Sequence, residues 1–290
     1  MMDFLRANQP VFDFFLLALG FAYSQQIVLR CGVFSLATAA FAALGAYASA
    51  LLLTRVGLPA YLALAAALLI GALAAWLVSV PLARLRGVYQ AIATLGLVEV
   101  IVSLALYAEP LTGGAVGLNS LPKLVGTPEL LVAVLVTAYL VHAISSSGLG
   151  RSFDALRQDE MVASSLGVSS RKNHALAFVL SGAIGGLFGG LQALYAYSVQ
   201  PTQFGFAFMV ASLTAIILGG RRSLLGPAIG AAILTLLPEL ARPLAEYRPL
   251  VNGVILILVV VFLPQGAGDT LLAALRQRRA RQLALHTGKV

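Results

Sequence analysis

Residues able to do chemistry are scarce in this chain, and most of them are gathered in one stretch. Residues 150–172 combine Asp159 and Glu160 with Arg157 and further basic residues, in a sequence of which only 10% is charged. Such a block between apolar segments is either a solvated loop or a helical surface that docks another protein. A second feature is Glu99, which lies inside an apolar run and therefore either lines an aqueous route or hydrogen-bonds a neighbouring helix.

Motifs for catalysis or nucleotide binding do not occur. The only Gly-Lys pair, Gly288-Lys289, lacks the following helix that a phosphate-binding loop needs, and neither His-Glu-x-x-His nor Gly-x-Ser-x-Gly is found. The histidines stand alone at His142, His174 and His286. A single cysteine, Cys31, cannot form an intrachain disulfide or a cysteine cluster for metal. The sequence therefore predicts no enzyme, no cofactor and no metal site.

The composition defines the class of protein. Hydrophobic residues make up 60% of the chain, whereas about half of a soluble domain is apolar and about a quarter is charged. Uncharged runs such as 62–78 are apolar on every face, which suits a helix crossing a hydrocarbon core of about 30 Å and excludes the alternating strands of a membrane barrel. We predict an all-α, polytopic transmembrane bundle that forms a single domain over residues 1–290.

Apolar runs between charged or Gly/Pro-marked breaks predict about eight to ten spans. The N-terminus has no basic excess, so the first span is expected to stay rather than be removed as a signal peptide. The segment 207–219 is short and is followed by a Gly- and Arg-containing break, which predicts a broken or re-entrant helix. Glycines 182, 186 and 190 lie four residues apart and predict the close approach of another helix. The spans are 12–29, 33–53, 58–80, 88–107, 128–146, 174–197, 207–219, 224–240 and 249–264.

The distribution of basic residues predicts the orientation, because cytoplasmic loops collect Lys and Arg. Placing 150–172 in the cytoplasm leaves five of the 19 basic residues outside and puts the other 14 inside with the C-terminus. The basic tail, 267–290, then needs no role beyond topology and attraction to anionic lipid, and no nucleic-acid partner is expected. The five outer residues are Arg6, Arg55, Lys123, Arg242 and Arg248.

Spans one to three and spans seven to nine cross the membrane in the same directions, and each set contains a Ser-Leu pair followed by a Gly-Ala pair. This similarity favours a parallel internal repeat.

Several motifs occur together in one order along residues 30–266. Glu160-x-x-Ala163-x-x-x-Gly167 resembles the loop by which permease subunits of ABC importers engage their ATPases. The ordered set as a whole resembles the permeases of branched-chain amino acid importers, in particular the M-type (LivM-like) subunit. The set comprises 87–100 (GVYQAIATLGLVEV), 111–118 (LTGGAVGL), 155–168 (ALRQDEMVASSLGV), 177–191 (AFVLSGAIGGLFGGL), 225–231 (LGPAIGA) and 262–266 (FLPQG).

The resemblance implies an inner-membrane permease working by alternating access. Its expected partners are a homologous H-type permease, two cytoplasmic ATPases and a periplasmic binding protein. The expected substrate is a branched-chain or related amino acid, with urea, short amides and aromatic acids as alternatives. A stand-alone ion- or proton-coupled transporter, with Glu99 as the coupling site, and a structural membrane-assembly protein are the alternative functions.

Two groups of site residues follow. In the coupling loop, 148–173, apolar residues would seat in the ATPase, charges would fix the register and Gly167 would allow a sharp turn; Leu156 is expected among the seated residues. The second group is expected to line the translocation path and comprises Glu99, the outer glycine loop and two re-entrant breaks. At these breaks the sequence departs from the family pattern, so the identity of the substrate is not predicted. The coupling residues are Arg157, Asp159, Glu160, Met161, Ala163, Leu166 and Gly167. The path residues are Glu99, Thr112, Gly113, Gly114, Thr38, Gly219 and Gly220.

Overall fold

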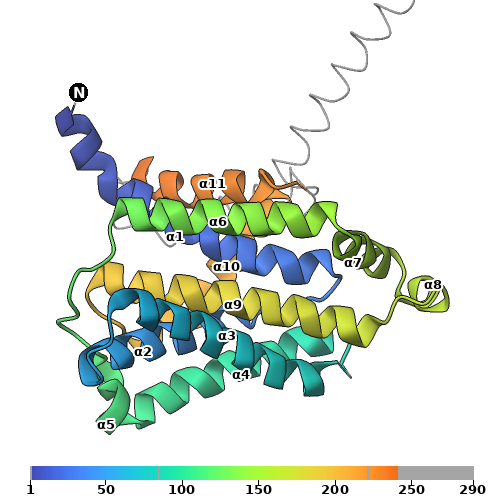
Figure 1. Cartoon of the computed structure of the whole chain (residues 1–290), viewed down its shortest axis with the longest axis horizontal. Helices are drawn as coiled ribbons and strands as arrows, with labels where there is room; N and C mark the ends of the chain where they lie inside the picture. Colours follow the sequence, from blue (N-terminus) through green and yellow to red (C-terminus); the bar gives the residue numbers. More distant parts are fainter. Residues whose placement is uncertain (1, 84, 221–222, 241–290) are drawn as a thin grey trace, which may run out of the picture. The chain divides into compact units, whose positions relative to one another are not determined.

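A computed structural model of the chain describes residues 2–83, 85–220 and 223–240. These residues form α-helices with two short 3-10 turns and no strand, which confirms the all-α class (Figure 1). The long helices are α1 (Met2–Arg30), α2 (Thr38–Arg55), α3 (Ala60–Leu82), α4 (Val88–Tyr107), α6 (Thr127–Ser146), α9 (Ser170–Ala196), α10 (Phe206–Gly219) and α11 (Gly226–Leu240). The short elements are α5 (Glu109–Thr112), η1 (Gly114–Val116), α7 (Gly148–Gln158), α8 (Glu160–Ser165) and η2 (Pro201–Phe204).

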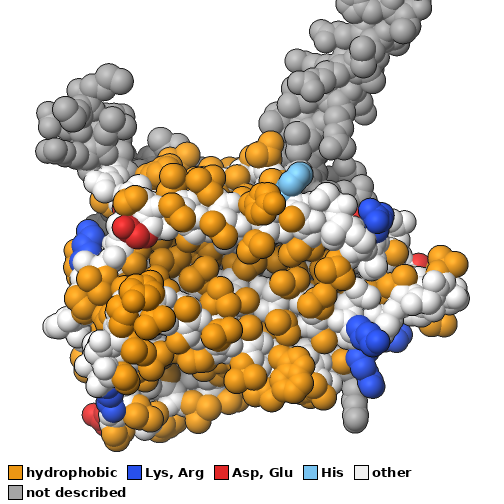
Figure 2. All heavy atoms as spheres, viewed as in Figure 1, with side chains coloured by type: hydrophobic (Ala, Val, Ile, Leu, Met, Phe, Trp, Pro, Cys, Tyr) orange, Lys and Arg blue, Asp and Glu red, His pale blue; other side chains and the backbone are white. Residues whose placement is uncertain are grey.

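Seven of the described helices are long and apolar enough to cross a membrane, if α10 is counted together with η2 before it. A shorter apolar helix follows at Gly226–Leu236. The polytopic bundle is thereby confirmed, and the first eight predicted spans coincide with helices. The ninth, 249–264, and the tail lie outside the described residues. Figure 2 shows hydrophobic side chains over the middle of the visible face, with Lys and Arg towards the ends of the helices.

The core of the first compact unit, residues 1–213, is organised around α9. A Cβ added at Gly182 would overlap the Gly71 carbonyl of α3, and one at Gly186 would overlap the Ala67 carbonyl. Gly190 lies against Ala67 as well. The predicted role of these glycines is confirmed, because only residues without a side chain let the two backbones approach this closely.

Helix α9 packs in the same way against α2. A Cβ at Gly45 would overlap the backbone of Gly186, and one at Gly189 would overlap the Ala42 carbonyl. Helix α1 also contacts α9, and Ser24 Oγ lies 2.8 Å from the Ser181 carbonyl oxygen, to which it donates a hydrogen bond. Helix α9 is therefore held by α2 and α3 at backbone-to-backbone range and by α1 through side chains.

The break between α1 and α2 is closed by buried polar side chains. Gln25 donates to the Ser35 carbonyl at 2.5 Å, and Thr38 Oγ1 donates to Gln25 Oε1 at 2.6 Å. The Leu36 amide donates to Thr94 of α4 at 3.0 Å. These bonds replace the helical ladder that is interrupted between α1 and α2, as buried backbone groups require.

The second compact unit begins at Thr214 and includes the end of α10 and all of α11. A Cβ at Gly219 would overlap the Gly226 carbonyl, and one at Gly230 would overlap the Ala215 carbonyl. At the break before α11, Ser223 Oγ accepts the Gly226 amide at 2.9 Å, much as Ser35 Oγ accepts the Ala37 amide at 3.1 Å in the first break. The internal repeat stays a prediction.

Candidate functional site

The charged block folds into two short helices, and the sharp turn expected at Gly167 follows the second of them. Helix α7 turns one face inward, where Phe153 is 1% exposed and Leu156 is 4% exposed. The expectation that Leu156 seats in a partner is therefore wrong: spaced three residues from Phe153, it lies on the same inward face of α7 and is covered by this chain itself.

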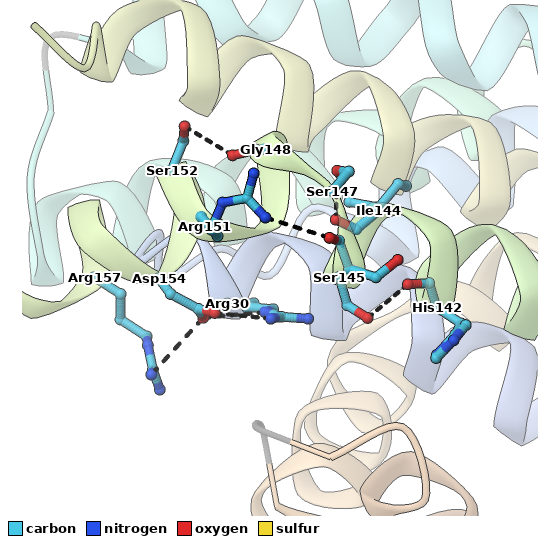
Figure 3. Close-up of polar contacts among 11 residues, drawn as sticks. Arg30, His142, Ile144, Ser145, Ser147, Gly148, Arg151, Ser152, Asp154 and Arg157 are labelled. Carbon is cyan, nitrogen blue, oxygen red and sulfur yellow. Dashed lines mark hydrogen bonds and ion pairs between the residues drawn. The ribbon is translucent and has the colours of Figure 1, made fainter.

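An ion pair ties α7 to the end of α1 (Figure 3). Arg30 donates from Nε to Asp154 Oδ1 at 3.1 Å and from Nη2 to Asp154 Oδ2 at 2.8 Å. The side chains are 17% and 36% exposed, and Arg157 Nη2 lies 3.9 Å from Asp154 Oδ1. A two-point contact between guanidinium and carboxylate fixes orientation as well as distance, so α7 is held in register with α1.

Helix α8 is capped and tied separately. Asp159 accepts the amides of Met161 and Val162 at 2.9 and 3.0 Å, as an N-cap residue does. Arg86, in the loop between α3 and α4, lies 3.2 Å from Glu160. Two of the charges predicted to fix a partner's register, Arg157 and Glu160, are thus already engaged within the chain.

Beyond these contacts, α8 presents an apolar tip. Met161, Val162 and Leu166 are 75%, 56% and 79% exposed, whereas Ala163 is buried at 3%. Gly167 follows with a φ of +87°, and a Cβ added there would meet nothing within 4 Å, so the backbone conformation alone calls for glycine in this turn back towards α9. We call Met161, Val162 and Leu166 the α8 tip.

The opposite end of the first unit is built from turns. Thr112 Oγ1 donates to the Ala105 carbonyl at 2.5 Å, and Gly113 has a φ of +75° that a side chain would strain. The following loop pairs with the chain after α9 through reciprocal bonds of 2.9 Å between Leu118 and Val199. The loop is therefore ordered by its own backbone contacts.

Lysine and arginine side chains hold this end together further. Lys123 Nζ lies 5.6 Å and 5.5 Å from the ring centres of Tyr195 and Tyr197, which are cation–π distances. Arg55 donates to the carbonyls of Pro110 and Leu111.

The predicted path residues are not brought together in one place. Glu99 is exposed on α4, away from the buried stripe that includes Val98 and Val102. Thr38 is 3% exposed and bonded to Gln25, while Thr112 and Gly114 lie in the turns at the opposite end. Gly219 and Gly220 belong to the second unit, where Gly220 has a φ of +97°. A shared path for these residues stays a prediction.

Sequence reasoning missed Arg30 and Arg86, the partners of the charged block, and it missed Asp154 as the block residue that binds Arg30. Alternation of the spans did place both arginines at the same end as the block, so the signal available was opposite charge at one end of the bundle. It did not specify pairs, because Arg30 and Asp154 are 124 residues apart in the chain.

Within residues 2–83, 85–220 and 223–240, no group of three or more His, Cys, Asp or Glu side chains could hold a metal ion. Cys31, in the turn after α1, is buried. Burial, and secondarily the charge of Glu160, raises the pKa of the Cys31 thiol to about 12. The thiol therefore stays protonated at neutral pH, which makes it a poor nucleophile or metal ligand.

Comparisons with known proteins agree with the motifs. A family model described as "Branched-chain amino acid transport system / permease component" matches residues 11–263. The chain is 31% identical over 278 residues to the high-affinity branched-chain amino acid transport system permease protein LivM of Escherichia coli K12, covering 83% of this chain and 64% of that protein. The LivM protein of Salmonella typhimurium LT2 is 32% identical over 274 residues, with the same coverage.

A second kind of permease from such systems is also similar. LivH of Escherichia coli K12 is 33% identical over 138 residues, which cover 47% of this chain and 44% of that protein. For the LivM relatives, the matched region spans less than two thirds of their length. No solved structure gives a significant match.

Proposed function

The chain belongs to the family of permease components of branched-chain amino acid transport systems, and from this premise we propose that it is the membrane-spanning subunit of an ATP-driven importer. Its expected cargo is a branched-chain or related amino acid. Its expected partners are a second, H-type permease subunit, two cytoplasmic ATPases and a periplasmic binding protein.

The α8 tip carries this proposal. Exposed apolar side chains that cluster in a patch outside a membrane span mark an interaction site. Met161, Val162 and Leu166 project from a short helix whose capped start, at Asp159 and Glu160, is fixed to the rest of the chain. Because the start of α8 is fixed to the chain and its exposed tip is apolar, the helix is suited to dock into a groove of an ATPase.

The anchors would also transmit motion. Arg30 joins α7 to α1, and Arg86 joins α8 to the loop between α3 and α4. Closure of the ATPase pair around nucleotide would therefore pull at once on the end of α1 and on the loop between α3 and α4. Alternating access requires such a link between nucleotide state and the packing of the spans.

Orientation follows from the same assignment. The α8 tip would face the cytoplasm, with Arg30 and Arg86 at the same end, as the inside excess of basic residues favours. The ordered turns around Thr112, Gly113 and Gly114 would then face the periplasm, near the mouth where a binding protein delivers its cargo. The C-terminus would be cytoplasmic.

The proposal is tested in proteoliposomes that contain the chain with its second permease, ATPase and binding-protein partners. Met161→Asp and Leu166→Asp should each lower substrate-stimulated ATP hydrolysis about tenfold or more, because a charge replaces a central apolar contact. Met161→Leu is the matched control and should stay close to wild type.

A stand-alone, ion-coupled transporter is not favoured by the chain's similarity to transport-system permease components. Uptake by the isolated chain, driven by an ion gradient and unchanged by Met161→Asp, would overturn the importer proposal.

A further inference from the structure

The outward face of helix α4 exposes apolar residues such as Ile92, Val100 and Leu104, and it also carries polar and small residues among them. Gly96, Glu99 and Ser103 are spaced three and four residues apart, so they share one side of the helix. Glu99 and Ser103 are exposed, and a Cβ added at Gly96 would meet nothing within 4 Å. We call these three residues the α4 stripe. It lies away from the face on which Val98 and Val102 pack against Ala39 and Ala40 of α2.

The α4 stripe differs from the outward faces of α3 and α6. Helix α3 exposes Leu69, Leu73, Trp76, Leu77 and Val80, and such residues can face lipid directly. Helix α6 exposes a similar set at its centre: Leu131, Val132, Leu135, Val136 and Leu140. The hydrocarbon of a membrane therefore suits α3 and α6, but it does not suit a carboxylate in the middle of α4.

Position and burial single out Glu99 among the charged residues of the described spans. It is the twelfth residue of a 20-residue helix, whereas the exposed charges Arg55, Glu129, Arg171 and Lys172 each lie in the first or last turn of their helices. Asp13 of α1 also enters a span, but it is only 2% exposed. Asp13 is covered from within, and Glu99 is left for something else to cover.

We propose that the α4 stripe is the contact surface for a second, non-identical permease subunit, one of whose spans supplies a hydrogen-bond donor or cation to Glu99. This rests on the proposed importer function. The open space at Gly96 would let the partner's helix approach closely, as small residues do at helix contacts in membranes. Ser103, one turn beyond Glu99, would add a second polar contact.

Like-charge repulsion disfavours a second copy of this chain as the occupant. A symmetric pair of copies uses the same patch on both sides, which would bring two Glu99 carboxylates towards each other. In a region of low dielectric, such a pair is unfavourable unless one carboxylate is protonated. A related but different subunit, with a donor at the corresponding position, avoids that conflict.

The test uses the full complex in membranes. A photo-reactive diazirine amino acid replaces Ser103 in the otherwise unchanged chain, and the adduct is identified by mass spectrometry after illumination. The expected adduct joins this chain to the second permease subunit. Substitution of the same amino acid for Leu73 on α3 is the matched control and should give lipid adducts instead.

Other adducts from position 103 would overturn the inference. Attachment to another copy of this chain, to residues 241–264 of the same chain, or to lipid alone would each assign a different occupant. If such an adduct forms while the subunits co-purify and Met161→Asp still lowers stimulated ATP hydrolysis about tenfold, the α4 assignment is wrong and the importer function is retained. If no second permease or ATPase co-purifies, the importer proposal itself fails.

Variants of Glu99 give an independent readout. Glu99→Gln keeps a hydrogen-bonding side chain and should retain the second subunit during purification. Glu99→Lys puts a cation opposite the expected donor and should lower the recovered second subunit about tenfold. Equal recovery with both variants, at equal membrane levels of this chain, would contradict the assigned role of Glu99.

Discussion

The interior around α9 and the α7–α8 segment are held by opposite kinds of contact. Around α9, glycines bring the backbones of α2 and α3 so close that no side chain fits between them. In α7–α8, Asp154 and Glu160 are bound by arginines from the end of α1 and from the loop between α3 and α4, across part-exposed surface. The first arrangement tolerates almost no displacement, whereas the second can lengthen or re-form as its helices move.

This difference separates a rigid frame from a movable attachment. Packed interiors switch between discrete arrangements rather than deforming continuously. Ion pairs at a surface contribute little to stability, yet they set orientation. Helix α9 and the helices packed on it are therefore suited to move as one rigid unit. The α7–α8 segment is suited to be the contact through which an ATPase would move that unit.

The largest expected effect comes from filling the α9 interior. Gly186→Leu should lower the free energy of unfolding by more than about 3 kcal/mol or prevent folding, because its side chain must displace the backbone of α3. Gly148→Ala is the matched control, since a Cβ there meets only Arg151, at 3.8 Å. The membrane level and the melting temperature in detergent measure both. Equal stability of the two variants would mean that α9 is not the rigid part.

A smaller effect is expected where α7 joins α1. A double-mutant cycle with Arg30→Ala and Asp154→Ala should give a coupling energy of about 1–2 kcal/mol, because the contact is bidentate and partly shielded from water. Unfolding in a denaturing detergent measures each corner of the cycle. A coupling near zero would show that α7 is held by Phe153 and Leu156 alone.

The sequence predicts the helix packing around α9 better than it predicts the ion pairs of the α7–α8 segment. Glycines four residues apart indicate a close helix contact, because helical periodicity alone places them on one face. The three-residue spacing between Leu156 and Phe153 indicates that both lie on one buried face, whereas the charges around Leu156 favour a surface exposed to a partner.

The ion pairs could not be specified in the same way. Which arginine meets Asp154 or Glu160 depends on how helices far apart in the chain are arranged, and periodicity within one helix carries no such information. The outward position of Glu99 is a similar case: the sequence places it within a span, but the neighbours of α4 decide which side of that helix is covered.

The smallest change in stability is expected for Arg86 and Glu160, and it separates the two roles most sharply. Arg86 is 71% exposed, so Arg86→Ala should alter the free energy of unfolding by about 0.5 kcal/mol or less. If the pair transmits motion, however, ATP hydrolysis should respond several-fold less to substrate in the reconstituted complex, because α8 would move without the loop between α3 and α4. The exchanged pair, Arg86→Glu with Glu160→Arg, should recover much of that response, although Arg at the start of α8 opposes the helix dipole. Unchanged stimulation in Arg86→Ala would leave the contact of α7 with α1 to transmit the motion without help from the α8 ion pair.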